Sequence, residues 1–198
     1  MPQPATQTTP DESQAITWAL QGRAEGWEIL HARHYNGLWS AVYPIVRDEH
    51  LAEDVIQEAF IKAYRQIHHF KGHSKFSTWL YRIAVNQAYD TLRKLSRRNK
   101  WLGLFPLQDE DDGPAHEAID PHTGADDAQR ADLRQIIGDA LDSLNPEQRS
   151  VVELRLIQGF STEETAKILG CKKGTVLSRL FYSCQKLKKR MGEHYGKL

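Results

Sequence analysis

Apolar residues recur every three or four positions along most of the chain, which is the spacing of helices that bury one face. Before residue 100 this pattern predicts four helices, and Pro44 should kink the second of them or mark its end. They run from about 9 to 20, from about 27 to 44, from 49 to about 68 and from 77 to about 98, with Thr9 and Pro10, Asp48 and Ser77 at the starts of the first, third and fourth. No stretch of useful length has the two-residue period of a strand. The sequence therefore predicts an all-α fold.

Two short helices near the C-terminus form the most specific pattern. Ser161 should cap the first, Glu164 should reach back to the cap amide, and Gly170 should end it. The second carries one apolar stripe, made of Val176, Leu180, Cys184, Leu187 and Met191, which places Cys184 in the core. Further helices are expected near 132–144 and 146–158. The capped pair is the outline of a helix-turn-helix, whose second helix enters the DNA major groove.

Charge divides the chain into blocks although the formal net charge is zero. Residues 62–100 hold ten Lys or Arg against one acid, and residues 102–132 hold nine acids against one base. From Trp101 to about residue 130, proline, glycine and acids replace the periodic apolar residues, which indicates a linker. We expect a disordered N-terminus (1–8), two small helical domains (9–100 and 132–195) and an acidic flexible linker (101–131). The basic blocks favour two polyanion-binding modules.

The cysteine usage and the absence of long apolar runs point to the cytoplasm. Cys171 and Cys184 form neither a CxxC pair nor a disulfide framework, which indicates a reducing compartment. The sequence shows no secretory signal, and no segment approaches the ~18 apolar residues of a membrane span. We expect a cytoplasmic protein with no stable membrane insertion.

An enzyme is the alternative from another functional class. Its strongest support would be a metal site among His31, His34, His68, His69 and His73. No HExxH motif is present, and Gly72 interrupts the helix expected around His73. We expect no catalytic residue, no metal and no cofactor.

Three predicted helix faces carry polar, aromatic or cationic side chains. Aromatic, amide and guanidinium groups can stack on bases, read base edges and neutralise phosphates. Two alternatives stay open, because Trp79 and Tyr89 could be peripheral core and the charged lines could be solvated helix faces. The faces comprise Asp54, Gln57, Glu58 and Arg65 on the third helix; Trp79, Arg82, Asn86, Tyr89, Arg93 and Arg97 on the fourth; and Thr175, Ser178, Arg179, Tyr182 and Lys186 on the last, after Lys172 and Lys173 at its start.

Three segments, taken in order, resemble the extracytoplasmic-function (ECF) group of bacterial sigma factors. They are AEDVIQEAF at 52–60, FSTWLYRIAVN at 76–86 and the helix-turn-helix at 161–180. The resemblance extends from about residue 17 to 190 and implies a sigma-two domain followed by a sigma-four domain. It implies that the protein binds core RNA polymerase, recognises minus-ten and minus-thirty-five promoter elements and assists DNA melting. One departure is CKKGT at 171–175, where the family commonly has Ser-Pro-Gly-Thr, so the cap of that helix is left open.

The resemblance also implies which residues make these contacts, with Asn86 at the position that reads a base edge. The core-polymerase residues are Asp54, Gln57, Glu58, Ile61 and Arg65; the minus-ten residues are Phe70, Lys71, Gly72, Ser74, Phe76, Trp79, Arg82, Asn86, Tyr89, Arg93 and Arg97; the minus-thirty-five residues are Lys172, Lys173, Gly174, Thr175, Ser178, Arg179, Tyr182 and Lys186.

The expected partners are core RNA polymerase, promoter DNA and an anti-sigma factor, the last because family members are commonly held inactive by one. The acidic linker could imitate phosphate charge in a basic groove of the polymerase, or it could be a solvated tether. The closest rival function is an autonomous helix-turn-helix regulator, which would bind duplex DNA tightly without polymerase.

Overall fold

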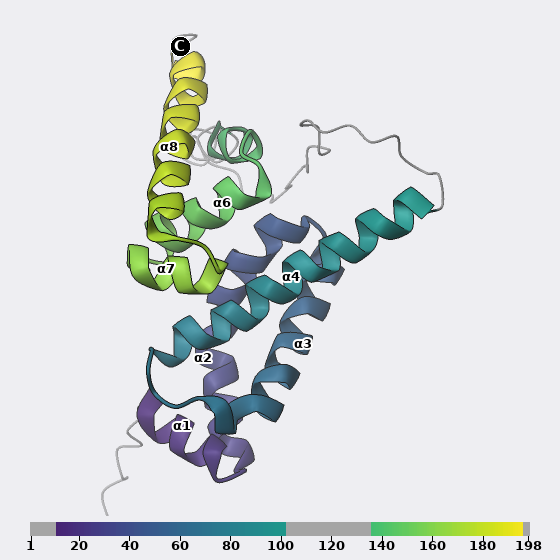
Figure 1. The fold of residues 1–198 in the computed structure, drawn as a ribbon, viewed down its shortest axis with the longest axis vertical. Coiled ribbons are helices and arrows are strands. Elements are labelled where there is room, and N and C mark those ends of the chain that lie inside the picture. Colours follow the sequence, from purple (N-terminus) through teal and green to yellow (C-terminus); the bar gives the residue numbers. More distant parts are fainter. Residues whose placement is uncertain (1–10, 102–135, 196–198) are drawn as a thin grey trace, which may run out of the picture. The chain divides into compact units, whose positions relative to one another are not determined.

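A computed structural model describes residues 11–101 and 136–195, with backbone alone at 99–101 and 193–195. Each regular element within these ranges is a helix and none is a strand, which confirms the all-α prediction (Figure 1). The chain divides into two compact units, Met1–Thr91 and Leu92–Leu198. The predicted disorder at 1–8 and the linker at 102–131 lie outside the described residues. The domain limits 9–100 and 132–195 stay predictions.

The first unit begins with α1 (Glu12–Leu20) and α2 (Ala24–Val46). Asp11 caps α1, and its carboxylate accepts from the Glu12 amide at 2.7 Å, so the helix begins later than expected from Thr9 and Pro10, which are not described. The two helices approach closely at Gly26, where a Cβ would lie 2.5 Å from the Ala15 carbonyl oxygen. Only glycine permits this approach.

Pro44 lies inside α2 rather than at its end. Proline lacks an amide hydrogen, so one bond of the helix ladder is missing there. The helix nevertheless continues to Val46 and ends at Arg47, whose φ of 53° is left-handed. The alternative that Pro44 marks the end of this helix was therefore wrong.

Helix α3 (Glu49–Gln66) packs against α2, and η1 (Ile67–His69) follows it. Its predicted cap is confirmed, since the Asp48 carboxylate accepts from the Leu51 amide at 2.9 Å. Helix α4 (Phe76–Trp101) then begins one residue before Ser77, because the carbonyl of Lys75 already accepts from the Trp79 amide at 3.2 Å. Ser77 is thus inside the helix rather than its cap.

A buried histidine connects α1, α2 and α4. His34 is 8% exposed, its Nε2 lies 2.7 Å from Oε1 of Glu12, and its ring centre lies 5.6 Å from that of Phe76. Burial lowers the pKa of His34, although the Glu12 carboxylate opposes that shift. A neutral ring that donates to Glu12 fits this environment.

The second unit contains a helical segment at 136–142, α6 (Pro146–Val152), the π-helical turn η2 (Glu153–Ile157), α7 (Thr162–Leu169) and α8 (Lys173–Tyr195). The cap of α7 is as predicted: Ser161 and Glu164 form a capping box, and Gly170 ends the helix with a φ of 63°. Another capping box, from Asn145 and Gln148, starts α6.

The core of the second unit joins Val151, Ala166 and Val176. On α8, Ser183 is 0% exposed whereas Cys184 is exposed, so the prediction that Cys184 is core was wrong. A helix turns 100° per residue, and the seam that α6 and α7 cover passes through 176, 180, 183 and 187 instead.

Candidate nucleic-acid and protein interfaces

The outer line of α3 is exposed as predicted from its helical spacing. Asp54, Gln57, Glu58, Ile61 and Arg65 are exposed, and Ile61 leaves 50% of its surface free. Such a mixed polar and aliphatic line on one helix is suited to contact with another helix.

One residue of this line also ties α3 to α4. The side-chain amide nitrogen of Gln87 donates to the Glu58 carboxylate, and Nζ of Lys62 donates to the Gln87 carbonyl oxygen. Gln87 is only 4% exposed. Glu58 is therefore exposed on the surface and also orients α4 through Gln87.

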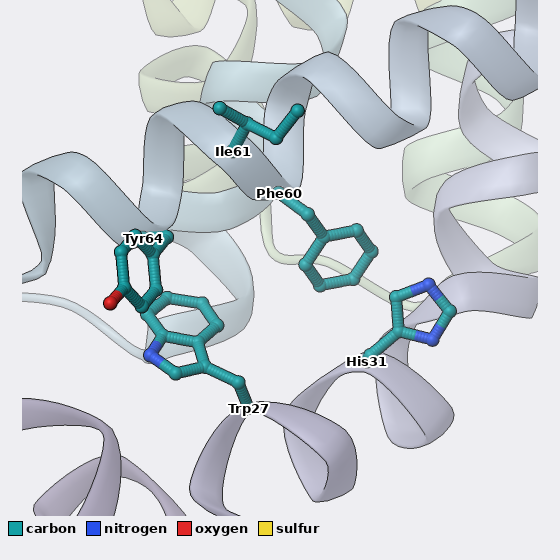
Figure 2. A pocket seen from close by; sticks show the side chains of 5 residues that line it. All are labelled: Trp27, His31, Phe60, Ile61 and Tyr64. Atoms are coloured by element: carbon teal, nitrogen blue, oxygen red, sulfur yellow. The ribbon is translucent and has the colours of Figure 1, made fainter. Parts of the chain in front are cut away.

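Beside this line lies a shallow apolar hollow of about 250 Å³ between α2 and α3. Figure 2 shows the five side chains around it, which are Trp27, His31, Phe60, Ile61 and Tyr64. The Trp27 and Tyr64 ring centres are 5.5 Å apart, and those of His31 and Phe60 are 4.6 Å apart. Sequence reasoning found only Ile61 here, because the hollow depends on how two helices pack.

An aromatic cluster forms where the loop after η1 enters α4. The ring centres of Phe70, Phe76 and Trp79 lie 5.5 to 5.6 Å from one another. Phe76 is 2% exposed, whereas Phe70 and Trp79 are half-buried. Phe76 thus lies under the cluster rather than on its surface.

The loop itself presents small and cationic groups beside the cluster. Lys71 and Gly72 are exposed, and Ser74 is partly covered. Gly72 has a φ of 71°, a left-handed conformation that side chains with a Cβ rarely adopt. The loop therefore needs glycine at this position.

The outer face of α4 continues from this cluster. Arg82, Asn86, Arg93 and Arg97 are exposed, and Trp79 and Tyr89 are partly buried. Trp79 and Tyr89 are thus partly packed, as expected of peripheral core residues, and partly exposed, as expected of residues that contact DNA. A stacked base could use the open side.

The second unit contains the predicted helix-turn-helix, made of α7, the turn after Gly170 and α8. The Cys171 amide donates to the Ala166 carbonyl at 3.1 Å, which closes the end of α7. The main-chain carbonyl of Lys172 accepts from the amides of Thr175 at 3.0 Å and Val176 at 3.2 Å. The carbonyl of Lys172 therefore accepts the first helical bonds of α8.

The predicted DNA-contacting residues of α8 divide into two groups. Lys172, Lys173, Gly174, Ser178 and Tyr182 are exposed; Thr175, Arg179 and Lys186 are partly buried.

Two acids lie close to the cations of this surface. Arg179 forms an ion pair with Glu147 of α6, and Nζ of Lys173 lies 3.0 Å from the Glu163 carboxylate. The hydrogen bond from Lys173 lowers the pKa of Glu163, with Lys167 adding to the effect. Bound phosphates would compete with these carboxylates for Lys173 and Arg179.

Sequence reasoning missed Leu177 and Phe181, which are 54% and 58% exposed on α8. Both lie off the predicted apolar stripe, but the predicted DNA-contacting face of this helix did not include them. The helical rotation set by Val176 and Ser183 turns them outward.

No group of three or more metal-ligating side chains occurs within residues 11–98 and 136–192. None of the helices described is long and apolar enough to cross a membrane.

Comparison with known families matches both units. Residues 30–98 match Sigma-70 region 2, and residues 134–187 match Sigma-70, region 4. The first match includes α3, the aromatic cluster and most of α4, and the second includes the helix-turn-helix.

Several relatives are similar along most of their length. The ECF RNA polymerase sigma-E factor of Escherichia coli is 37% identical over 164 residues, which cover 81% of this chain and 84% of that protein. The corresponding factor of Haemophilus influenzae is 34% identical over 161 residues, with 81% and 85% covered. The RNA polymerase sigma-H factor of Pseudomonas aeruginosa is 29% identical over 184 residues, with 93% and 95% covered.

Two solved structures share the fold at 24% identity. One is the sigma factor RpoE in complex with the anti-sigma factor NepR from Bartonella quintana, with a TM-score of 0.66 over 85% of this chain and 98% of that chain. The other is CnrH in complex with the cytosolic domain of CnrY, with a TM-score of 0.62 over 90% and 96%.

Proposed function

The chain belongs to the extracytoplasmic-function group of RNA polymerase sigma factors, and we propose that its α3, α4 and α8 surfaces divide the work of initiation between them. The observation that carries this proposal is the presence of two separate cationic faces in one chain, the α4 face with its aromatic cluster and the start of α8. An autonomous helix-turn-helix regulator needs only the cationic face at the start of α8. The proposed partners, core polymerase and promoter DNA, place the protein in the cytoplasm.

The exposed line on α3 is the proposed contact with core polymerase. Asp54, Gln57, Ile61 and Arg65 offer a carboxylate, an amide, an aliphatic group and a guanidinium along one helix. A helical partner could pair its own charges with this line and cover Ile61. Glu58 serves the same surface by holding α3 against Gln87 of α4.

The α4 face and the loop before it are the proposed contact with the minus-ten element. Base removal from the stack costs a few kcal/mol, so a flipped base needs a surface that stabilises it. The open sides of Phe70 and Trp79 supply stacking area, and Lys71 and Ser74 supply a cation and a hydroxyl. Arg82, Arg93 and Arg97 would neutralise the phosphates of the same strand. Phe76 acts from beneath, by holding the two rings above it.

The start of α8 is the proposed contact with the minus-thirty-five element, with Ser178 and Tyr182 facing the groove and Lys172 and Lys173 facing phosphates. Arg179 is paired with Glu147, so a DNA phosphate would compete with that carboxylate for its guanidinium. Two neighbours in fold were solved with another protein bound, one with the cytosolic domain of CnrY and the other with the anti-sigma factor NepR. We propose that this chain has such an inhibitor as well.

Runoff transcription with purified core polymerase tests the function. The full chain with core should yield promoter-dependent transcripts from genomic fragments, and core alone should not. Absence of any such transcript from a folded chain that binds core would count against the proposal. Tight, specific duplex binding by the chain alone would support the autonomous regulator instead.

Lys172→Ala combined with Lys173→Ala should weaken promoter binding by holoenzyme on all sequences alike. Each phosphate contact contributes about 0.9 to the slope of log affinity against log salt, so the slope should fall by about 1 to 2. The lower figure applies if Glu163 retains Lys173 in the complex. Lys188→Ala with Lys189→Ala removes equal charge about 24 Å further along α8 and serves as control. An unchanged slope with altered sequence ranking would contradict the phosphate assignment.

Gly174→Ala should stabilise the second unit and weaken promoter binding. A Cβ at Gly174 would meet nothing within 4 Å, and alanine favours a helix over glycine by up to about 1 kcal/mol. The new methyl group would stand on the face that approaches DNA. Thermal melting by circular dichroism and holoenzyme binding to promoter duplex measure the two effects.

Gly138→Ala is the matched control, because a Cβ there also meets nothing within 4 Å. It should not weaken promoter binding. Equal promoter affinity for Gly174→Ala and the unaltered protein would show that DNA does not approach this turn.

A further inference from the structure

The second and third turns of α8 carry three large exposed side chains. Leu177 and Phe181 are 54% and 58% exposed and lie four residues apart, so they form one line along the helix. Tyr182 is 60% exposed, and its ring centre lies 5.5 Å from that of Phe181. Three large side chains are thus left open to solvent on one helix, although burying each of them would stabilise the unit.

The surroundings of this strip favour nucleic acid as its occupant. It lies across the helix from Val176 and Ser183, which are buried in the unit. Lys172 and Lys173 are exposed immediately before it, and Gly174 and Ser178 lie beside it without bulk. Cations at the end of a strip attract a polyanion, whereas the strip itself needs an apolar group on that polyanion.

Thymine supplies that apolar group. In the major groove, which admits an α-helix, the C5-methyl of thymine distinguishes its edge from those of the other bases. We propose that Leu177 and Phe181 cover thymine methyl groups in the upstream promoter element, and so set a preference for thymine that polar contacts do not provide. This inference rests on the proposed function, because it takes α8 to be the helix in the major groove.

Replacement of thymine by deoxyuridine tests the inference, since it removes only the methyl group and keeps base pairing. The element is taken from promoters that the reconstituted holoenzyme uses. Holoenzyme binding should fall about 3- to 5-fold for each methyl group that the strip covers, the equivalent of one buried methyl or methylene group. Leu177→Ala and Phe181→Ala should bind the thymine template more weakly and lose the difference between the two templates.

Leu156→Ala is the matched control, because Leu156 is 57% exposed in the same unit but lies on η2. It should keep the full difference between thymine and deoxyuridine. Circular dichroism checks that each variant folds. We expect folding to be retained, because all three side chains are exposed.

Three results would overturn the inference. The holoenzyme could bind both templates equally at every position, the variants could keep the full difference, or the element could contain no thymine on either strand. Variants that lose affinity for polymerase or for an inhibitor, with the template difference intact, would make the strip a protein-binding surface instead. In each case promoter-dependent transcription by the unaltered holoenzyme would leave the proposed function standing.

Discussion

Phe76→Ala is expected to destabilise the first unit by about 3 to 5 kcal/mol, the cost of removing a large aromatic side chain from a core. Phe76 is 2% exposed and its ring lies 5.5 to 5.6 Å from those of Phe70, Trp79 and His34. The cavity would loosen both rings of the proposed minus-ten surface. Promoter opening should therefore fall together with stability.

Urea unfolding followed by tryptophan fluorescence measures this effect mainly in the first unit. Four of the five tryptophans, Trp18, Trp27, Trp39 and Trp79, lie in that unit, and Trp101 lies in the second. Phe181→Ala makes the same change at a site that is 58% exposed and should leave this transition in place. If Phe76→Ala abolished opening with an unchanged urea midpoint, the ring would contact DNA directly, as the family resemblance implied.

Asn86→Ala is expected to remove base preference at one position of the minus-ten element while core affinity stays the same. Asn86 is exposed on α4, and its amide has no partner among the described residues. An amide that makes paired hydrogen bonds to a base edge discriminates by about 1 to 3 kcal/mol, which corresponds to about 5- to 150-fold. The proposed core-binding line is on α3, so the substitution should not affect it.

Transcription from templates randomised in the minus-ten element, with sequencing of the products, measures the preference. Titration of labelled core measures the affinity. Asn36→Ala removes the same amide from an exposed position on α2 and should change neither. An equal loss of transcription on all templates would instead indicate that Asn86 contacts the DNA backbone. A loss of core affinity would indicate that Asn86 contacts the polymerase.

The ion pairs of the second unit explain why its proposed phosphate contacts and its proposed base contacts should respond differently to salt. Glu147 and Glu163 already partly neutralise Arg179 and Lys173 in the free protein. Exposed pairs of this kind contribute little to stability. Their larger effect is to lower the net free energy that phosphate contact would contribute to DNA binding. Discrimination between DNA sequences would then depend on the side chains that face the groove.

The sequence by itself determined the helices and most of their ends. Asp48, Ser161 and Gly170 were found correctly because a cap depends on residues within three or four positions of it. The exceptions were Ser77, which lies inside α4 because the helix begins one residue earlier, and the alternative that α2 ends at Pro44, since α2 continues to Val46.

Only the tertiary structure decided which of the expected contact residues are covered or paired. The family resemblance assigned Phe76 and Arg179 to DNA, but Phe76 is buried beside His34 and Arg179 is paired with Glu147, 32 residues away in the chain. Leu177 and Phe181 are exposed because no described element covers their side of α8. Helical periodicity defines faces relative to one another, whereas the partner that covers a face comes from distant parts of the chain. A sequence pattern therefore predicts a helix from neighbouring residues, but burial and charge pairing follow from the packing of whole helices.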